Sequence, residues 1–407
     1  MATELKPTSS LFPVKGIKLS SISAGIYKRK KRNDVVLIGL SDKSKVTAVF
    51  TKNAFFAAPV AVARKHLQSS TAQYCLINAG NANAGTGEQG IEDAFETCKA
   101  VARHGGCPPE SVLPFSTGVI GEKFPVDKIS AVIPELVENL SETNWNVCAE
   151  AIMTTDTVPK SVSKQVEIEG KTITITGITK GSGMIKPDMA TMLAFVGTDA
   201  CVEQPALNLL LKNAVKISFN RICVDGDMST NDACVLMATG KSGHQAITDD
   251  KGEAYKILQS AINEVCIFLA KAIVRDGEGA TKFISVIVDN GRTRDECLSV
   301  GYAIATSSLV KTAFFASDPN WGRILATVGR AGIDDLDVNR VSIYLNGCCI
   351  VKNGSVDKDY TEEQGKKVMS AEDIDLNISL DRGDEKEVIW TCDLSHDYVS
   401  INAEYRT

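Results

Sequence analysis

Short apolar runs alternate along the chain with segments whose apolar residues recur at helical spacing. Residues 35–40, 46–50 and 74–78 are apolar runs of the length typical of buried strands. Residues 166–178 alternate apolar and polar positions on both sides of Glu169-Gly170, which predicts a β-hairpin with Gly in its turn. Further strands are expected at residues 284–288, 341–345, 375–380 and 388–392.

Helical spacing of apolar residues marks residues 92–103, 207–217 and 254–274, and it predicts one long helix over residues 298–315. The glycines and prolines at 105–109 end the first of these helices. Strands and helices thus follow one another without the regular alternation of a doubly wound fold, and no G-x-G-x-x-G follows a first strand. We expect a mixed α/β (α+β) protein in which sheets pack under helices.

Composition places the chain among ordinary globular proteins, with 407 residues, 44% hydrophobic and 23% charged. At roughly 100–200 residues per domain, this length predicts two or three domains. A net charge of −6 does not attract polyanions, so we expect no nucleic-acid partner. The single basic run, residues 28–32, is interpreted as a solvated loop, with phosphate binding or nuclear targeting as the alternative.

The chain has 12 Cys but no C-x-x-C and no Cys/His pair at zinc spacing, so no metal site is predicted. No apolar run approaches the length of about 18 residues that a membrane span needs, and the N-terminus lacks the apolar core of a signal peptide. We therefore expect reduced thiols, a cytoplasmic protein and no membrane partner, with an organellar matrix as the alternative.

Two loops combine small residues with hydrogen-bonding groups. Residues 78–87 read NAGNANAGTG, between a predicted strand and a predicted helix. Backbone amides in such a loop can approach an anion, although a tight strand–helix turn explains the same composition. Residues 116–121 read STGVIG. A hydroxyl beside a Gly amide can form a two-donor oxyanion site, although a simple turn is the commoner explanation.

A third segment, residues 180–193, reads KGSGMIKPDMATML and passes from a Gly-rich loop into an apolar stretch. The hydroxyl of Thr191 lies next to the carbonyl of Ala190 in the covalent chain and can attack it if the loop is strained. Hydrolysis of the resulting ester frees the Thr191 amine, whose reference pKa of about 7.7–8.0 lets it act as the base for its own hydroxyl. An ordinary loop threonine is the alternative.

A fourth segment, residues 225–232, reads DGDMSTND and carries three carboxylates. It lacks the Glu that ends an EF-hand calcium loop, so we interpret it as a structural loop of Asx turns. The polar C-terminus, residues 401–407, is a frayed end unless the fold brings it to a pocket.

The third segment closely resembles the cleavage motif of the ornithine acetyltransferases of arginine biosynthesis, the bifunctional glutamate N-acetyltransferases. Six further segments resemble that family's blocks in the same order: residues 78–87, 117–121, 225–227, 277–282 (GEGATK), 317–323 (SDPNWGR) and the tail from Asn402 to Thr407. The resemblance covers nearly the whole chain. One departure lies near the cleavage motif, where Asp188 stands in place of the expected Asn, and its effect on cleavage stays open.

The resemblance implies a DmpA/ArgJ-like layered sandwich that cleaves itself into residues 1–190 and 191–407, assembled as a tetramer of two chains of each kind. It implies acetyl transfer from N-acetylornithine to glutamate through an acetyl ester on Thr191, with Thr117 and Gly118 stabilising the oxyanion. No cofactor is implied, and whether acetyl-CoA is also a donor stays open. The substrate contacts implied are Thr154, Lys180, Thr191, Glu278, Asn402 and Thr407.

Two alternatives remain at the level of sequence. A self-processing amidohydrolase or aminopeptidase of the same fold would use Thr191 but pass the acyl group to water. A non-catalytic amino-acid sensor would have no use for the cleavage motif, and the intact Ala190-Thr191 pair argues against it.

Overall fold

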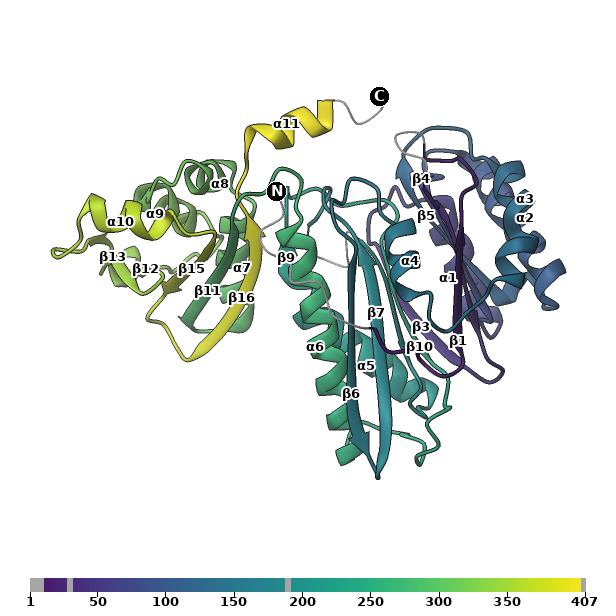
Figure 1. The fold of residues 1–407 in the computed structure, drawn as a ribbon. Coiled ribbons are helices and arrows are strands. Elements are labelled where there is room, and N and C mark those ends of the chain that lie inside the picture. The colour runs from purple at the N-terminus through teal and green to yellow at the C-terminus, as the bar shows by residue number, and fades with distance from the viewer. Residues whose placement is uncertain (1–10, 28–31, 187–191, 404–407) are drawn as a thin grey trace.

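Strands that are apolar on both faces form the centre of the molecule, and helices cover them. The computed structural model describes residues 11–27, 32–186 and 192–403. Within these residues the strands form three sheets, of four, five and seven strands (Figure 1). The four-stranded sheet has the order β1 (Ile17–Ile22), β2 (Val35–Leu40), β4 (Tyr74–Asn81), β5 (Val112–Val119).

The five-stranded sheet has the order β3 (Lys45–Phe50), β10 (Ala233–Ala238), β8 (Leu193–Thr198), β7 (Lys171–Lys180), β6 (Lys160–Ile168). Strand β8 runs parallel to β10 and antiparallel to β7. The seven-stranded sheet has the order β14 (Ser355–Val356), β13 (Cys348–Lys352), β12 (Ser342–Leu345), β15 (Asp373–Ser379), β11 (Phe283–Gly291), β16 (Glu385–Cys392), β9 (Ile222–Cys223).

The described helices fall between these strands. They are α1 (Ala58–Ser69), α2 (Gly87–Gly105), α3 (Val126–Glu138), α4 (Trp145–Ala151), α5 (Gln204–Ile217), α6 (Glu253–Arg275), α7 (Arg294–Ala305), α8 (Ser308–Phe315), α9 (Trp321–Gly329), α10 (Glu362–Met369) and α11 (His396–Ala403). Three short 3₁₀ turns lie at Pro109–Ser111, Phe219–Arg221 and Val338–Arg340.

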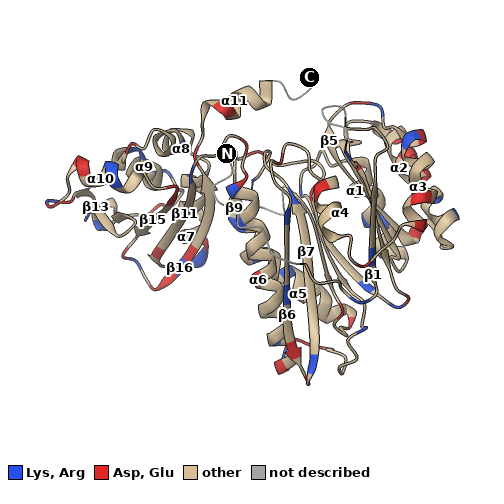
Figure 2. Cartoon of the chain, in the orientation of Figure 1, with Lys and Arg blue, Asp and Glu red and all other residues tan. Residues whose placement is uncertain are grey.

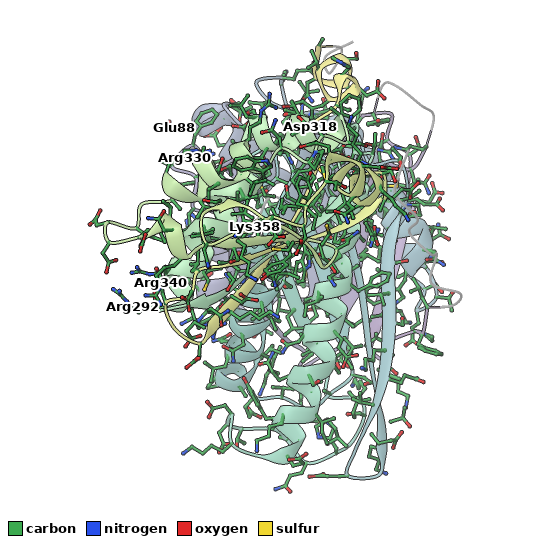
Figure 3. The ribbon with its side chains drawn as sticks, turned by 90° about the vertical axis from the view of Figure 1, so that its left-hand side faces the viewer. Glu88, Arg292, Asp318, Arg330, Arg340 and Lys358 are labelled. Carbon is green, nitrogen blue, oxygen red and sulfur yellow. The ribbon has the colours of Figure 1, made fainter. Side chains whose placement is uncertain are left out.

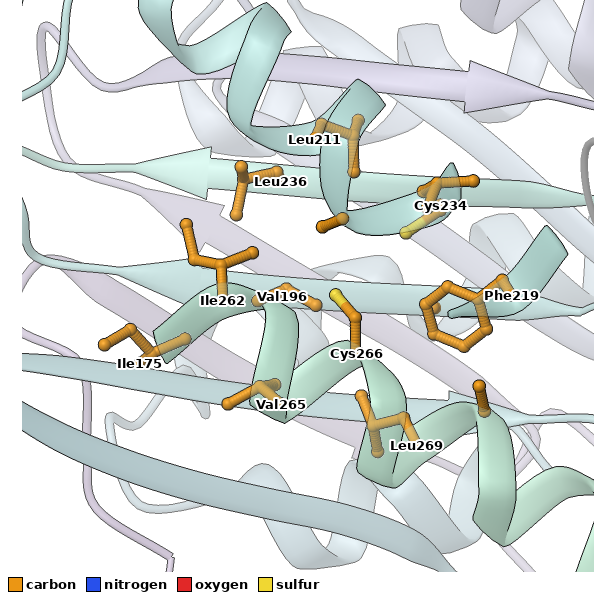
Figure 4. Packing of buried hydrophobic residues seen from close by; sticks show 14 of the residues in the cluster. Ile175, Val196, Leu211, Phe219, Cys234, Leu236, Ile262, Val265, Cys266 and Leu269 are labelled. Atoms are coloured by element: carbon orange, nitrogen blue, oxygen red, sulfur yellow. The ribbon is translucent and has the colours of Figure 1, made fainter. Parts of the chain in front are cut away.

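Alternation of side chains along β8 shows how the first two sheets pack. Ala194 and Val196 point to a core made with α5 and α6, the packing that Figure 4 shows around Val196. Leu193 and Phe195 point the other way, into a core shared with the four-stranded sheet. There the Phe195 ring meets Phe115 of β5 edge to face, with ring centroids 5.1 Å apart. The two sheets therefore pack face to face, and each inner strand is buried on both sides.

The outer face of the four-stranded sheet is covered by α2 and α3, through Leu37 and Leu76 against Cys98, Val101 and Ile133. The order of layers is helices α5 and α6, five-stranded sheet, four-stranded sheet, helices α2 and α3. The seven-stranded sheet forms a separate core with α7, α8 and α9. From it α11 extends across the top of the molecule in Figure 1. The predicted mixed α/β sandwich with helices outside is confirmed.

Most predicted elements are confirmed, including the hairpin β6–β7 and helices α2, α5 and α6. The long helix predicted over residues 298–315 is wrong: α7 and α8 meet at an angle of 60°. The Thr306 hydroxyl donates to the Tyr302 carbonyl, 2.7 Å away, and Ser307 is the N-cap residue of the next helix. Hydroxyl side chains that compete for backbone carbonyls in this way favour a helix end.

Helix α6 is long and apolar enough to cross a membrane, within the part of the chain that the structure describes. Its Leu258, Ile262, Val265 and Leu269 are instead buried against the five-stranded sheet. The helix is a core element of the sandwich.

Basic and acidic residues are interspersed along the chain (Figure 2). Arg292 and Arg340 lie at the outside of the seven-stranded module, as Figure 3 shows. Of the basic run 28–32 only Arg32 is described, because residues 28–31 lie outside the described part. Arg32 stacks on the Tyr27 ring, 3.9 Å from its centroid, and donates to the carbonyl of Met153, so the solvated-loop interpretation is wrong for this residue.

The packing at Phe195 generates a stability prediction. Phe195→Ala removes a fully buried ring from between the two sheets and should lower the free energy of unfolding by about 3–5 kcal/mol, because the rigid sheets cannot close the cavity. Urea unfolding followed by circular dichroism measures the change. Phe268→Ala removes the same ring from the exposed side of α6 and should cost less than about 1 kcal/mol. Equal losses in both variants would contradict the central position of Phe195.

Candidate active site

A cavity of about 240 Å³ lies at one edge of the sandwich. Strands β5 and β7 end at this edge, and β8 and β10 begin there. The antiparallel register sets Lys180, the last residue of β7, opposite Leu193, the first residue of β8. The parallel register sets Leu193 beside Ala233, the first residue of β10. The loops that follow β5 and β7 and the loops that precede β8 and β10 therefore meet at this cavity.

The structure places six of the residues predicted from sequence around this one cavity. They are Thr117, Gly118, Thr154, Lys180, Glu278 and Asn402. The predicted cleavage pair Ala190–Thr191 and the predicted contact Thr407 lie outside the described residues. Met192 and Leu193 line the cavity, so the described chain resumes at its wall.

Thr117 and Gly118 belong to strand β5 and not to a turn, which excludes the turn interpretation for them. Gly118 has φ +132°, and a side-chain carbon there would stand 2.3 Å from the carbonyl carbon of Gly80. Only glycine allows β4 and β5 to approach this closely at the cavity. The close approach fixes the backbone beside Thr117, as a preorganised donor pair requires.

Lys180 supplies a cation to the cavity wall. Its ammonium donates to the Thr117 hydroxyl, 3.2 Å away. Burial lowers the pKa of Lys180, and the nearby Asp156 carboxylate opposes this change. The lysine is thus a desolvated cation whose hydrogen-bonding capacity is only partly used by the described residues, which suits the binding of an anionic group.

Glu278 supplies a carboxylate to the same cavity. Its backbone amide donates to the Ser182 carbonyl at 2.9 Å, which ties it to the Gly-rich segment. Asn402 of α11 donates to Glu278 Oε2 at 2.7 Å. The expectation of a frayed C-terminal end is therefore wrong up to Ala403: residues His396–Ala403 form a helix, and this helix brings Asn402 to the cavity.

The segment 225–232 is structural only in its first part. The Asp225 carboxylate accepts hydrogen bonds from the amides of Met184 and Ile185, at 2.6 and 2.9 Å, and so holds the Gly-rich segment. Its last residues line the cavity: Ser229, Thr230, Asn231 and Asp232. The purely structural interpretation of this segment is wrong. The signal in the sequence was the position of these residues immediately before the apolar run 233–238.

A charge cluster that the sequence did not reveal lies beneath the cavity. The Lys160 ammonium, whose side chain is fully buried, binds Asp156 at 2.6 Å and Asp276 at 2.5 Å. Although burial raises it, the pKa of Asp156 is held below its usual value by the Lys160 and Lys180 cations and by the Gly181 amide. Burial lowers the pKa of Lys160, but the two carboxylates more than offset this effect.

This cluster joins three segments of the cavity wall. Asp156 accepts the amides of Thr154 and Gly181, at 3.0 and 2.7 Å. Asp276 accepts the Thr157 amide at 3.0 Å and stands two residues before Glu278. The substrate-contact candidates Thr154, Lys180 and Glu278 are thereby fixed relative to one another through Lys160.

Most residues of the other segments predicted from sequence lie away from the cavity. In residues 78–87 the asparagine side chains donate to backbone carbonyls: Asn78 to Asn81 at 2.8 Å, Asn81 to Lys123 at 3.0 Å and Asn83 to Gly90 at 2.9 Å. Only Ala82 of that loop lines the cavity, so the loop is a strand–helix turn. Asn320 caps α9 within the seven-stranded module. The Lys282 ammonium donates to the carbonyls of Met369 and Ala371.

The described residues contain no group of three or more His, Cys, Asp and Glu side chains that could hold a metal ion. All 12 cysteines are free thiols. Chemically, the cavity joins a cation, a carboxylate and a hydroxyl beside a glycine amide. An amino acid derivative carries an anionic carboxylate and, in some cases, a cationic side chain, and this wall offers a partner to each.

Comparison with known proteins gives matches over the whole chain. The model of the ArgJ family matches residues 18–407. The "Arginine biosynthesis bifunctional protein ArgJ" of Pseudomonas syringae pv. tomato is 53% identical over 407 residues, which cover 100% of both chains. The protein of the same name from Pseudomonas fluorescens is also 53% identical, with the same coverage. The crystal structure of "Arginine biosynthesis bifunctional protein argJ" from Bacillus halodurans aligns with 53% of this chain and 100% of that chain, at 36% identity and a TM-score of 0.51.

The buried charge cluster generates the prediction of this subsection. Lys160→Met leaves two buried carboxylates without their cation and should lower the free energy of unfolding by about 3–5 kcal/mol. Urea unfolding at pH 7 measures the change. Lys164→Met, on the same strand, breaks only the surface pair with Glu264 and should cost less than about 1 kcal/mol. A Lys160→Met protein as stable as Lys164→Met would show that the cluster does not hold these segments together.

Proposed function

Because the chain belongs to the ArgJ family, we propose that it is an acetyltransferase of arginine biosynthesis that moves the acetyl group of N-acetylornithine to glutamate. The observation that carries the proposal is the single cavity that joins Thr117, Gly118, Lys180 and Glu278 at the start of β8. Lys180 pairs with the α-carboxylate that both amino acids possess. Glu278 pairs with the side-chain ammonium of ornithine.

The proposed nucleophile is Thr191, freed as a new N-terminus when the Ala190–Thr191 bond breaks. Its hydroxyl oxygen attacks the acetyl carbonyl while the hydroxyl proton passes to its own α-amine. The carbonyl oxygen becomes an oxyanion, stabilised by Thr117 and Gly118. The bond from the acetyl carbon to the ornithine nitrogen then breaks, and that nitrogen takes the proton. An acetyl ester of Thr191 remains.

Glutamate completes the cycle by the same steps in reverse. Its amine attacks the acetyl ester, the Thr191 oxygen leaves and regains a proton, and N-acetylglutamate departs. Thr154, Asn402 and Thr407 complete the set of substrate contacts in this proposal. Thr154 and Asn402 support it by their place in the cavity wall.

The same proposal includes the quaternary and cellular arrangement. We infer two chains, 1–190 and 191–407, assembled as a tetramer of two copies of each, acting in the cytoplasm without a cofactor. The protein names of its relatives include the word bifunctional. We accordingly propose acetyl-CoA as a second acetyl donor to glutamate at the same residue.

The first functional prediction concerns processing. The purified protein should give two bands on a denaturing gel, and intact-mass analysis should place the break between Ala190 and Thr191. Thr191→Ala should remain a single chain, because the attacking hydroxyl is absent. Thr230→Ala, which removes a hydroxyl from the cavity wall but not the nucleophile, is the matched control and should still be cut. A break at another bond would refute Thr191 as the nucleophile.

The second functional prediction concerns the acetyl-enzyme. Incubation with N-acetylornithine alone should add one acetyl group to the 191–407 chain, and ornithine should leave before glutamate enters. Initial-rate lines at varied glutamate should then be parallel. Intersecting lines with no acetylated chain by mass spectrometry would defeat the covalent mechanism. An acetylated chain that decays to acetate equally fast with and without glutamate would identify an amidohydrolase instead.

A further inference from the structure

Asp232 is a buried carboxyl in the cavity wall whose hydrogen-bonding capacity is not used up by the described residues. The residue is only 2% exposed and lines the cavity. It stands immediately before β10, and the next amide, that of Ala233, donates to the Met192 carbonyl at 3.0 Å. Asp232 and Met192 are therefore neighbours at the start of two parallel strands.

The Ser229 and Thr51 side chains and the Met192 amide hydrogen-bond to the carboxyl group. Its oxygen Oδ2 nevertheless has no hydrogen-bond partner among the described residues. Burial raises the pKa of Asp232 well above its usual value. A buried carboxyl oxygen without a hydrogen bond lowers the stability of the folded protein unless a donor binds to it.

No described cation fills this role. The cation that acts on the pKa of Asp232 is Lys180, whose ammonium hydrogen-bonds to Thr117 rather than to Asp232. Lys180 is also attracted more strongly by Asp156 than by Asp232. Among the described residues, the Oδ2 oxygen of Asp232 is thus left without a donor.

Cleavage before residue 191 would create a donor of the required kind within reach. Standard backbone geometry keeps consecutive backbone nitrogens within about 4 Å of each other, whatever the conformation. The α-amine of residue 191 therefore lies within about 4 Å of the Met192 nitrogen that already donates to Asp232. In the uncut chain that nitrogen is a peptide amide and carries no charge.

We propose that Asp232 is a further catalytic residue, whose free carboxylate oxygen binds the α-amine released at Thr191 and stabilises its protonated form. The inference rests on the proposed function, since it requires the cleavage. In the acylation step the Thr191 hydroxyl proton passes to the α-amine, which becomes an ammonium beside the Asp232 carboxylate. The ammonium then gives this proton to the departing ornithine nitrogen. Between the two proton transfers the Asp232 carboxylate pairs with the Thr191 ammonium. The carboxylate itself neither gains nor loses a proton.

The sign of the effect on the amine is fixed by this pairing. An anion beside an amine raises its pKa, so replacing the anion with a neutral group lowers it. Asp232→Asn keeps the size of the side chain and an oxygen to accept the Met192 amide. The pKa of the α-amine should therefore fall by about 1–3 units in this variant.

The test uses the processed enzyme and reads the amine directly. An amine-reactive reagent labels the N-terminus of the 191–407 chain at a series of pH values, and mass spectrometry of the N-terminal peptide gives its titration curve. In Asp232→Asn the curve and the acidic limb of kcat/KM should both move to lower pH by the same amount. The value of kcat on the plateau should fall on the order of 10²-fold, because the ammonium loses its stabilising partner.

Asp199→Asn is the matched control. Asp199 is equally buried, follows the other end of β8 and does not line the cavity. It should leave the titration curve and the acidic limb unchanged. A purely structural role of Asp232 would reduce the amount of active enzyme without moving either curve, and unmoved curves in Asp232→Asn would overturn the proposal.

A second measurement serves if Asp232→Asn is not cut. In the uncut Thr191→Ala background the carboxyl has no cationic partner, so adding Asp232→Asn should leave the melting temperature unchanged or raise it. A clear fall in that background would show that the carboxyl is already satisfied in the uncut chain and would overturn the proposal. Absence of cleavage in the parent protein would refute the proposed function itself, whereas normal cleavage with unmoved titration would refute only the role of Asp232.

Discussion

The burial of strand β8 on both of its faces is the constraint on which the site depends. All six residues of this strand are buried, because α5 and α6 cover one face and the four-stranded sheet covers the other. A strand in this position cannot slip by one residue without exchanging its two apolar faces. Its register with β7 and β10 is thereby fixed, and with it the position of Met192 and Leu193 in the cavity wall.

The charges around the cavity follow from the same enclosure. Lys180 is buried at the end of β7. It interacts electrostatically with Asp156 and Lys160, which together with Asp276 form the buried ion-pair cluster. In this desolvated setting each unpaired charge is expensive, so the network is nearly closed. Glu278, bonded to Asn402, and Asp232, with its free oxygen, are the acidic groups that face the cavity itself. Acidic groups that face a cavity are available to bind a substrate or a reacting group.

The sequence predicted elements well where local pattern decides structure. The hairpin β6–β7 follows from alternation around Glu169-Gly170, and both residues adopt positive φ. The single helix over residues 298–315 failed because apolar spacing continues through Thr306-Ser307, whereas the Thr306 hydroxyl bonds back to the Tyr302 carbonyl where α7 ends and Ser307 is the N-cap residue of α8. The spacing of apolar residues along the sequence does not show which hydrogen bond a hydroxyl side chain makes in the folded protein.

The residues of the candidate site also fall into those that the sequence predicted and those that it did not. Thr117, Gly118, Lys180 and Glu278 were found through resemblance to a family, and no local pattern would have joined them. Lys160 was missed because its two carboxylate partners stand 4 and 116 residues away, and only the second tertiary contact turns it into a buried cluster. Asp232 was assigned to a structural loop because its neighbour Met192 comes from another strand. Pairings of this kind depend on sheet order, which the sequence does not state.

Sheet order also explains how the fold tolerates a break before residue 191. In the five-stranded sheet β3, β7 and β6 precede the predicted break, whereas β10 and β8 follow it. The two product chains therefore interleave: β10 pairs with β3 along its whole length, and β8 pairs with β7. Both apolar cores of the sandwich contain residues from before and after the break. Separating the chains would expose these cores and break two ladders, so cleavage removes one covalent bond while the packing that positions β8 persists. The proposed break would thus place the new chain end next to a strand already held on both sides, which is where a nucleophile needs a rigid support.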